Sequence, residues 1–248
     1  MDLLSLPPVA AMLDLTASGL MTLITFLTPV AGPLSAALAV VLLTLVVRAA
    51  LVPVGIAQAK AEQTRARLAP RLRTLQTRHR NDRERLQRET MKLYRDEGAS
   101  PFAGCLPLLL QAPVVGLVYA VFLHTSIAGH DNPLLGQTLF GVPLGRGFVS
   151  AVAEQSLDPA TVAVTGAIVV ALAVIAELTR RLLRPPAPAS DQTAVGVPPA
   201  FVGALPFVTA VIALFVPTAA ALYLLTTSAW TLGQRLILRR VYPPEPVT

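Results

Sequence analysis

The stretch that decides the fold is Phe201–Leu238, FVGALPFVTAVIALFVPTAAALYLLTTSAWTLGQRLIL, which is almost continuously apolar for 38 residues. At about 1.5 Å per residue, a single helix of that length would be far longer than the roughly 30 Å apolar core of a bilayer. Pro217 lies near its middle, and a helix interior tolerates proline poorly. The stretch therefore predicts two membrane-spanning helices with a turn close to Pro217.

Three further apolar runs are each long enough to cross a bilayer once. They occupy residues 33–56, 101–124 and 161–183, and together with residues 200–238 they give five spans. The composition agrees, because 54% of the 248 residues are hydrophobic and only 14% are charged, against about 25% charged residues in a typical soluble domain. We therefore predict an all-α membrane protein with five transmembrane helices.

Residues 1–32 leave two interpretations open. Val9–Leu27 is long enough to cross the membrane, but it carries Asp14 and is followed by two prolines. No Lys or Arg precedes Arg48, so the segment has neither the charged start of a secretory signal nor the arginine-rich pattern of a transit peptide. We expect an external helix that lies in the membrane interface, with a sixth span as the alternative.

The basic residues predict the orientation of the spans. Residues 57–98 hold twelve of the twenty Lys and Arg residues, and six more arginines follow the third and fifth spans. In a five-span arrangement all eighteen share one side, whereas the opposite loops carry only Arg146. The positive-inside rule then places the N-terminus and the loop 125–160 outside. The Pro-rich loop 184–199 and the tail 239–248 lie in the cytoplasm.

Residues 57–98 have the pattern of a helical hairpin. Apolar side chains repeat at i, i+4 and i+7 on both sides of a polar break, at Leu68, Leu72 and Leu75 and again at Leu86, Thr90 and Leu93. Folding back near Asn81 would bring the two sets together, which predicts an antiparallel cytoplasmic hairpin with a thin apolar seam. Pro70 is expected to start or kink the first helix rather than to lie in its middle.

The strongly basic exterior of this hairpin has more than one interpretation. The simplest is a solvated surface that fixes the membrane topology. The same charge could attract anionic lipid headgroups or ribosomal RNA, both without sequence readout. Few aromatic residues are interleaved with the basic ones, so base stacking is not expected.

Arg48 is the most informative residue inside a predicted span. An arginine near the centre of a span costs about 2.5–3.5 kcal/mol on insertion scales. About eight residues separate Arg48 from Ile56, or roughly 12 Å of helix. Snorkelling of the side chain to the cytoplasmic surface is one interpretation. The functional interpretation is that Arg48 faces water inside the bundle.

Other spans carry polar residues at a similar depth, and these are Gln111, Thr209, Thr226, Thr227 and Ser228. Glu177 is shallower and could pair with Arg48 or with its neighbour Arg181. A single Ser or Thr in a membrane helix is weak evidence, because such residues commonly serve helix packing. Several of them level with an arginine indicate a hydrated cavity in the cytoplasmic half of the bundle.

Three stretches of the sequence are distinctive, namely LVVRAALVP at 45–53, LYRDEGASPFAGCLPLLLQAP at 93–113 and the last span from Val216 to Gln234. In these stretches the sequence resembles the YidC/Oxa/Alb family of membrane protein insertases. The residues that carry the second motif are Pro101, Gly104, Cys105, Pro107 and Pro113. Cys105, the one cysteine, is interpreted as a packing residue rather than a nucleophile.

The resemblance implies an insertase in a bacterial cytoplasmic membrane that does no covalent chemistry and is not an enzyme. It implies a hydrophilic groove, open to the cytoplasm and to lipid, that is lined by Arg48, Gln111, Thr209, Tyr223, Thr226, Thr227 and Ser228. Arg48 would attract acidic segments of the substrate. The implied partners are nascent membrane proteins and the bilayer, with the ribosome and the general secretion channel as further candidates and no DNA.

Other function classes fit the sequence less well. Three scattered histidines and one cysteine give no metal-ligand spacing, and no phosphate-binding loop motif occurs, so we expect no metal, no cofactor and no ATP site. The main alternative is a small-solute (anion) channel or transporter subunit, because an intramembrane arginine can also bind anions. Five spans, however, do not divide into two equal inverted repeats. A scaffold whose basic hairpin docks a partner is a third possibility.

Overall fold

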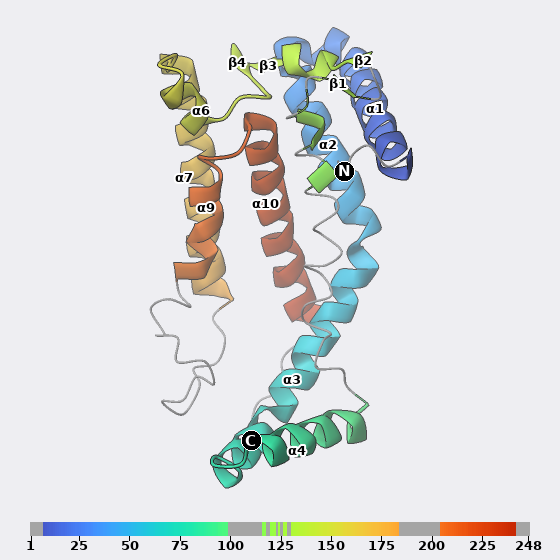
Figure 1. The fold of residues 1–248 in the computed structure, drawn as a ribbon, viewed down its shortest axis with the longest axis vertical. Coiled ribbons are helices and arrows are strands. Elements are labelled where there is room, and N and C mark those ends of the chain that lie inside the picture. The colour runs from blue at the N-terminus through green and yellow to red at the C-terminus, as the bar shows by residue number, and fades with distance from the viewer. Residues whose placement is uncertain are drawn as a thin grey trace. The chain divides into compact units, whose positions relative to one another are not determined.

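The computed structural model describes residues 7–98, 116–117, 120–122, 124, 126–127, 130–183 and 204–241. This part of the chain is mostly helical, as the apolar runs predict (Figure 1). It divides into two compact units. We call Met1–Ala49 with Pro113–Leu232 the bundle unit, and Ala50–Ala112 with Gly233–Thr248 the hairpin unit.

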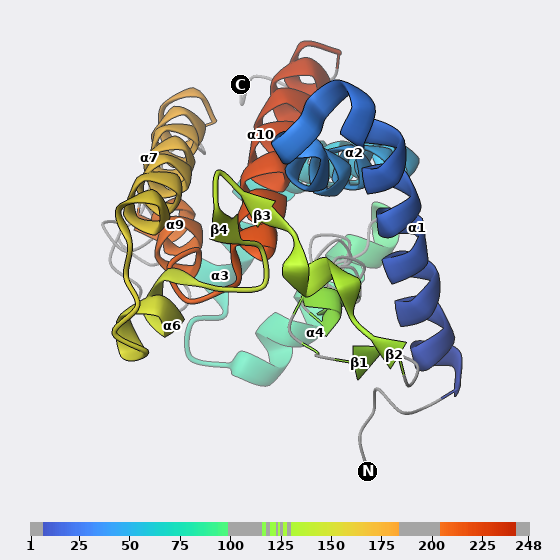
Figure 2. The ribbon, with the colours of Figure 1, turned by 90° about the horizontal axis from the view of Figure 1, so that it is seen from above.

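The bundle unit begins with two helices joined by a single 3₁₀ turn. Helix α1, Pro7–Ala31, leads through η2, Gly32–Leu34, into α2, Ser35–Ala50. Gly32 has a φ of +51°, a left-handed conformation that glycine adopts without strain. In the view from above, α1 is seen from the side over most of its length, so its axis lies at a steep angle to that of α2 (Figure 2).

Helix α1 packs through one face and exposes apolar side chains on the other. The packed face is a stripe at helical spacing, made of Leu13, Ala17, Leu20 and Ile24. The exposed face includes Leu15 and Phe26, which water solvates poorly. Helix α1 also contacts the loop elements β1 and η4. That this N-terminal helix lies in the membrane interface, and does not form a sixth span, stays a prediction.

The second half of the bundle unit is built on a long apolar helix. Helix α7, Pro159–Leu182, lies beside η5, Leu205–Phe207, and α9, Val208–Ile212, in both views (Figures 1 and 2). The chain then turns at Pro217 into α10, Thr218–Val241. The first turns of α10 are buried in the core, where Tyr223 and the small residues Ala219–Ala221 pack.

Asp158 caps the start of α7. Its two carboxylate oxygens accept hydrogen bonds from the backbone N–H of Thr161 at 2.8 Å and from the Thr161 hydroxyl at 2.9 Å. The backbone N–H would otherwise be one of the unsatisfied donors of a helix start. Because both bonds favour the ionised carboxylate, they lower the pKa of Asp158.

Two helical segments among the described residues are long and apolar enough to cross a membrane, Ala11–Ala50 and Pro159–Leu182. Helix α10 is not one of them, because polar and basic residues fill its second half. The predicted span 101–124 and the start of the fourth span lie mostly outside the described residues. The five spans and their orientation therefore stay predictions.

The loop 125–160 departs from the all-α expectation. It contains two minimal antiparallel pairs, β1 (Ser126–Ile127) with β2 (His130–Asp131) and β3 (Thr138–Leu139) with β4 (Val142–Pro143). Between them lies η4, Pro133–Gly136, and Phe148–Ala153 forms the short helix α6. The β3–β4 turn places Phe140 at φ +50° and Gly141 at +86°, the two positive φ values of the tightest hairpin turn.

The hairpin unit contains two helices that fold back on each other. Helix α3, Val52–Arg78, leads through a short turn into α4, Arg83–Asp96, whose start is capped by Asp82. Leu68 is only 1% exposed, and the other five residues of the predicted seam are half-buried. Arg67 and Arg71 both bond Glu97 just beyond α4, at 2.9 and 2.5 Å, which fixes the two helices as antiparallel.

The expectation that Pro70 starts the helix was wrong, and a kink at this proline stays a prediction. Pro70 lies inside α3, which begins at Val52 and continues through the proline. A proline costs a helix interior about 3 kcal/mol, because it lacks an N–H and crowds the preceding turn. Within one turn of the proline, Leu68 is buried and Arg67 and Arg71 pair with Glu97, so helix packing and ion pairs on this turn offset part of that cost.

Candidate functional site

Arg48 occupies the last turn of α2 and is half-buried in the bundle unit. It forms no ion pair within the described part of the chain. Its guanidinium lies close enough to Tyr223 of α10 for the two groups to interact electrostatically. The structure thus brings together two of the predicted groove residues that are far apart in sequence.

Tyr223 and Thr227 form a buried polar pair on α10. The two residues are one helical turn apart, and Tyr223 is 2% exposed. Their hydroxyls are close enough to interact. Among the described residues, however, neither the Tyr223 nor the Thr227 hydroxyl completes a hydrogen bond of normal geometry. Buried hydroxyls are normally hydrogen-bonded, so these two hydroxyls can each form a hydrogen bond with a further group.

The neighbouring polar residues of α10 differ in how they are satisfied. The Thr226 hydroxyl donates to the Leu222 carbonyl at 2.9 Å, as is common for Thr in helices. Ser228 is half-buried. Thr209 lies on α9, which packs against α7, and within the described residues no hydrogen bond or ion pair joins its side chain to Arg48. Gln111 and the five motif residues of the second predicted span lie outside the described residues.

Glu177 pairs with its own helix rather than with Arg48. Its carboxylate binds Arg180 at 2.7 and 2.8 Å and Arg181 at 2.5 Å. Of the two partners expected for Glu177, the structure selects Arg181 and adds Arg180. The carboxylate that could have neutralised Arg48 is therefore engaged elsewhere, and the positive charge of Arg48 is uncompensated within the described residues.

Sequence reasoning missed Asn132, a buried residue that closes a helix end. Its side-chain amide donates to the carbonyls of Val121 at 2.6 Å and His124 at 2.9 Å, and its oxygen accepts from the Leu134 N–H at 3.1 Å. The helical residues 120–122 end the second predicted span, so Asn132 satisfies carbonyls that a helix end leaves free. The only local signal was the Asn-Pro pair, which marks a turn.

The described residues contain no group of three His, Cys, Asp or Glu side chains that could hold a metal ion. Within the described part of the chain, the site combines the charge of Arg48 with the buried hydroxyls of Tyr223 and Thr227. What it can do is attract anionic groups and solvate polar ones within an apolar bundle.

Comparison with known proteins identifies the family. The model of the 60Kd inner membrane protein family matches residues 26–245. The chain belongs to this family. It is the YidC/Oxa/Alb family of membrane protein insertases that the motifs at 45–53 and 93–113 resemble. The predicted family is therefore confirmed, and with it a membrane location.

The relatives in this family come from bacteria and chloroplasts. The chain is 29% identical over 223 residues to the "Membrane protein insertase YidC" of Streptomyces avermitilis, covering 83% of this chain and 51% of the relative. It is 27% identical to the "Inner membrane protein ALBINO3, chloroplastic" of Arabidopsis thaliana, covering 86% and 48%. A Clostridium perfringens YidC is 42% identical over 81 residues, covering 33% and 34%. The chain thus spans about half the length of these relatives, or less.

Proposed function

We propose that this member of the YidC/Oxa/Alb family inserts nascent membrane proteins into a bacterial cytoplasmic membrane without covalent catalysis. Five spans, with the N-terminus outside and the basic hairpin in the cytoplasm, form a groove that opens to the cytoplasm and to lipid. The single observation that carries the proposal is the half-buried Arg48 beside Tyr223, with no carboxylate paired to it in the described chain.

The positive charge of Arg48 attracts acidic residues of the substrate. Two unit charges 4 Å apart gain about 1 kcal/mol in bulk water and about 4 kcal/mol at the effective dielectric constant of a protein surface. A half-buried arginine lies between these limits, so an acidic residue in a substrate tail is drawn to it by a few kcal/mol. The tail then enters the bundle instead of remaining in the aqueous phase.

The hydroxyls near Arg48 solvate the entering segment. The buried hydroxyls of Tyr223 and Thr227 can replace part of the water that the substrate backbone leaves behind. Thr226, Ser228, Thr209 and Gln111 extend this polar lining in the proposed groove. The apolar distance that a hydrophilic tail must cross becomes shorter than the full bilayer core.

The basic hairpin gives the proposed partners a surface. Its arginines face the cytoplasm in the five-span arrangement, where a translating ribosome or the general secretion channel would approach. Arg67 and Arg71 share the single carboxylate of Glu97, so one positive charge of that pair remains, and the basic residues of α4 are exposed. Exposed basic residues attract polyanions at long range, and the attraction weakens with salt.

Site-specific photocrosslinking tests the proposal. A crosslinking amino acid is placed at Thr209, Thr226 or Ser228, and at the exposed apolar positions Val170 and Val174 of α7 as matched controls. A ribosome-bound nascent chain with one apolar segment should crosslink from the groove positions and much less from the controls. Equal crosslinking from both sets would contradict a groove.

The same measurement separates insertion from the alternative of an anion channel or transporter subunit. The observation that favours the alternative is again Arg48, because an unpaired arginine in a bundle also suits a small anion. A channel would conduct anions in proteoliposomes and would show no groove crosslinks to nascent chains. An insertase shows the crosslinks without the conductance.

A further inference from the structure

The loop before α6 runs beside the turn that leads into α10. The Val149 N–H donates to the Leu214 carbonyl at 3.1 Å, and the Ala219 N–H donates to the Leu144 carbonyl at 3.0 Å. Between these bonds, the N–H and the hydroxyl of Thr218 both donate to one carbonyl, that of Arg146, at 2.9 and 2.8 Å. We call residues 144–149 together with 214–219 the Arg146 clasp.

The clasp satisfies the start of α10. The first amides of a helix have no partner within the helix, and usually a capping side chain or water supplies one. At α10 the loop carbonyls of Arg146 and Leu144 accept from the Thr218 and Ala219 amides, and both of these residues are buried. The place where α10 begins is therefore set by the loop as well as by the sequence of the helix.

Gly147 allows the two segments to approach this closely. A Cβ atom on Gly147 would lie 2.6 Å from the Val216 carbonyl oxygen and 3.1 Å from the Val216 carbonyl carbon. The φ of Gly147 is −104°, which any residue adopts, so the requirement for glycine is steric. Both obstructing atoms belong to the backbone, so a side chain here would push the turn away.

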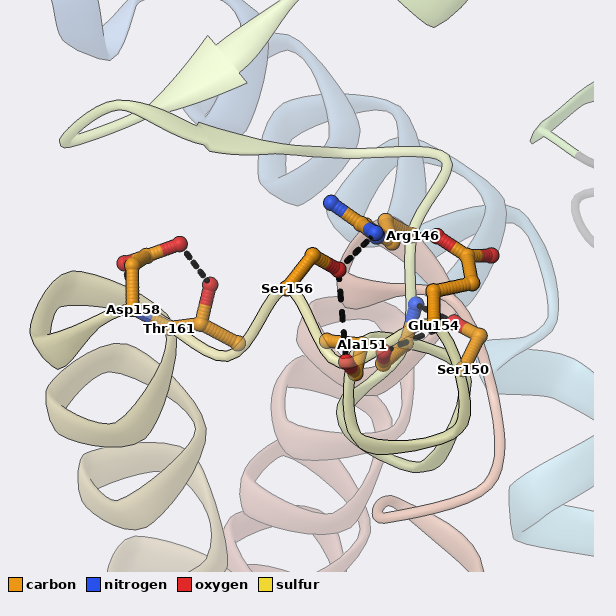
Figure 3. A network of polar contacts seen from close by, with 8 residues as sticks. Arg146, Ser150, Ala151, Glu154, Ser156, Asp158 and Thr161 are labelled. Carbon is orange, nitrogen blue, oxygen red and sulfur yellow. Dashed lines mark hydrogen bonds and ion pairs between the residues drawn. The ribbon is translucent and has the colours of Figure 1, made fainter.

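The loop side of the clasp is itself held firmly (Figure 3). The Arg146 guanidinium bonds the Glu154 carboxylate and the Ser156 hydroxyl at the end of α6. The Ser150 hydroxyl accepts from the Gly147 N–H at 3.1 Å and donates to the Gly147 carbonyl at 2.8 Å. Residues 146–147 are thus held by bonds within the loop region in addition to those with α10.

We infer that the Arg146 clasp sets the position of α10 and thereby the placement of the groove hydroxyls against Arg48. Helix α10 is continuous, so Tyr223 and Thr227 follow Thr218 at about 8 and 14 Å along the axis. A shift or rotation of the helix start moves both hydroxyls. Arg146, Gly147 and Thr218 are accordingly positioning residues for insertion, and this role rests on the proposed function.

The test measures the position of α10 and insertion in the same variants. Gly147→Ala adds the obstructing Cβ, and Gly136→Ala is the matched control because a Cβ there meets no atom within 4 Å. Thr218→Val removes one clasp hydrogen bond, and Thr218→Ser keeps it. With Cys105 replaced, spin labels at the exposed positions Val46 and Ala229 report the distance between α2 and α10. Insertion of an acidic-tailed, single-span substrate is followed in parallel.

We expect Gly147→Ala to shift or broaden the distance distribution and to slow insertion about tenfold, since small misplacements in a site have large effects on rates. Gly136→Ala and Thr218→Ser should match the wild type in both measurements, and Thr218→Val should lie between. If Gly147→Ala fails to fold, the contrast between Thr218→Val and Thr218→Ser decides by the same two measurements.

An unchanged distance distribution in the clasp variants would overturn the inference, whether or not insertion slows. So would a wild-type insertion rate in a variant whose α10 has moved. Failure of the proposed function has a different signature, since the wild-type protein would then insert no substrate while the distance measurement still reported on the clasp.

Discussion

Replacing Gly55 tests how closely α3 and α10 cross within the hairpin unit. A Cβ on Gly55 of α3 would lie 1.9 Å from Nε2 of Gln234 on α10, so the amide must change its rotamer in Gly55→Ala. The obstructing atoms are the far end of a flexible side chain, so moving them off their rotamer costs about 0.5–1.5 kcal/mol. Alanine in place of glycine gains about 1 kcal/mol in a helix interior. We expect the two effects nearly to cancel, so that Gly55→Ala changes the stability by less than about 1 kcal/mol.

The decisive comparison is Gly55→Ala in a protein that also carries Gln234→Ala. In a Gln234→Ala background the obstruction is gone, and Gly55→Ala should stabilise by about 1 kcal/mol through helix propensity alone. The same substitution thus stabilises more when Gln234 is truncated, with a coupling energy of about 0.5–1.5 kcal/mol. Equilibrium unfolding of the four proteins in mixed micelles, followed by circular dichroism, measures this cycle. An equal effect of Gly55→Ala in both backgrounds would refute the crossing.

Three further predictions concern other parts of the chain. Asn132→Ala should lower stability by about 1–3 kcal/mol, because it leaves buried carbonyls unpaired; thermal unfolding should show no such loss for exposed Thr138→Ala. For Asp158, whose pKa is lowered from its usual 3.8, the stability advantage over Asp158→Asn should be complete at neutral pH and vanish as the pH falls through that lowered pKa. A difference in midpoint that stays constant with pH would contradict this. A cysteine at Asp82, in a chain lacking Cys105, should resist membrane-impermeant labelling from outside intact cells, and labelling would contradict the orientation.

The local pattern of the sequence was enough to predict most helices and the seam of the hairpin. Periodicity reports which face of a helix is buried, and Leu68, expected in the seam, is among the most buried side chains. The same local logic failed at Pro70, which lies inside α3 and not at its start. It also missed the strands β3 and β4, whose turn depends on Phe140 adopting a positive φ.

The site was only partly predictable for a related reason. Arg48 is conspicuous in sequence because a charge in an apolar run is costly. Its partner on α10 was named by family resemblance, since no spacing rule links Arg48 to Tyr223. The Arg146 clasp was invisible, because its bonds join backbone groups about seventy residues apart and leave no side-chain pattern. Asn132 was missed because its side chain bonds nearby backbone groups, and the Asn-Pro pair signals only a turn.

Substitution of Arg48 tests the central claim most directly. The substrate is a single-span protein with an acidic tail, compared with the same protein whose Asp and Glu residues are replaced by Asn and Gln. If Arg48 acts by its positive charge, Arg48→Lys retains most insertion and Arg48→Ala loses about fivefold or more, as expected for an ion pair worth about 1–4 kcal/mol. The neutral tail should depend on Arg48 much less, with both variants folded. Insertion of the acidic-tailed substrate by Arg48→Ala at the wild-type rate would contradict the account.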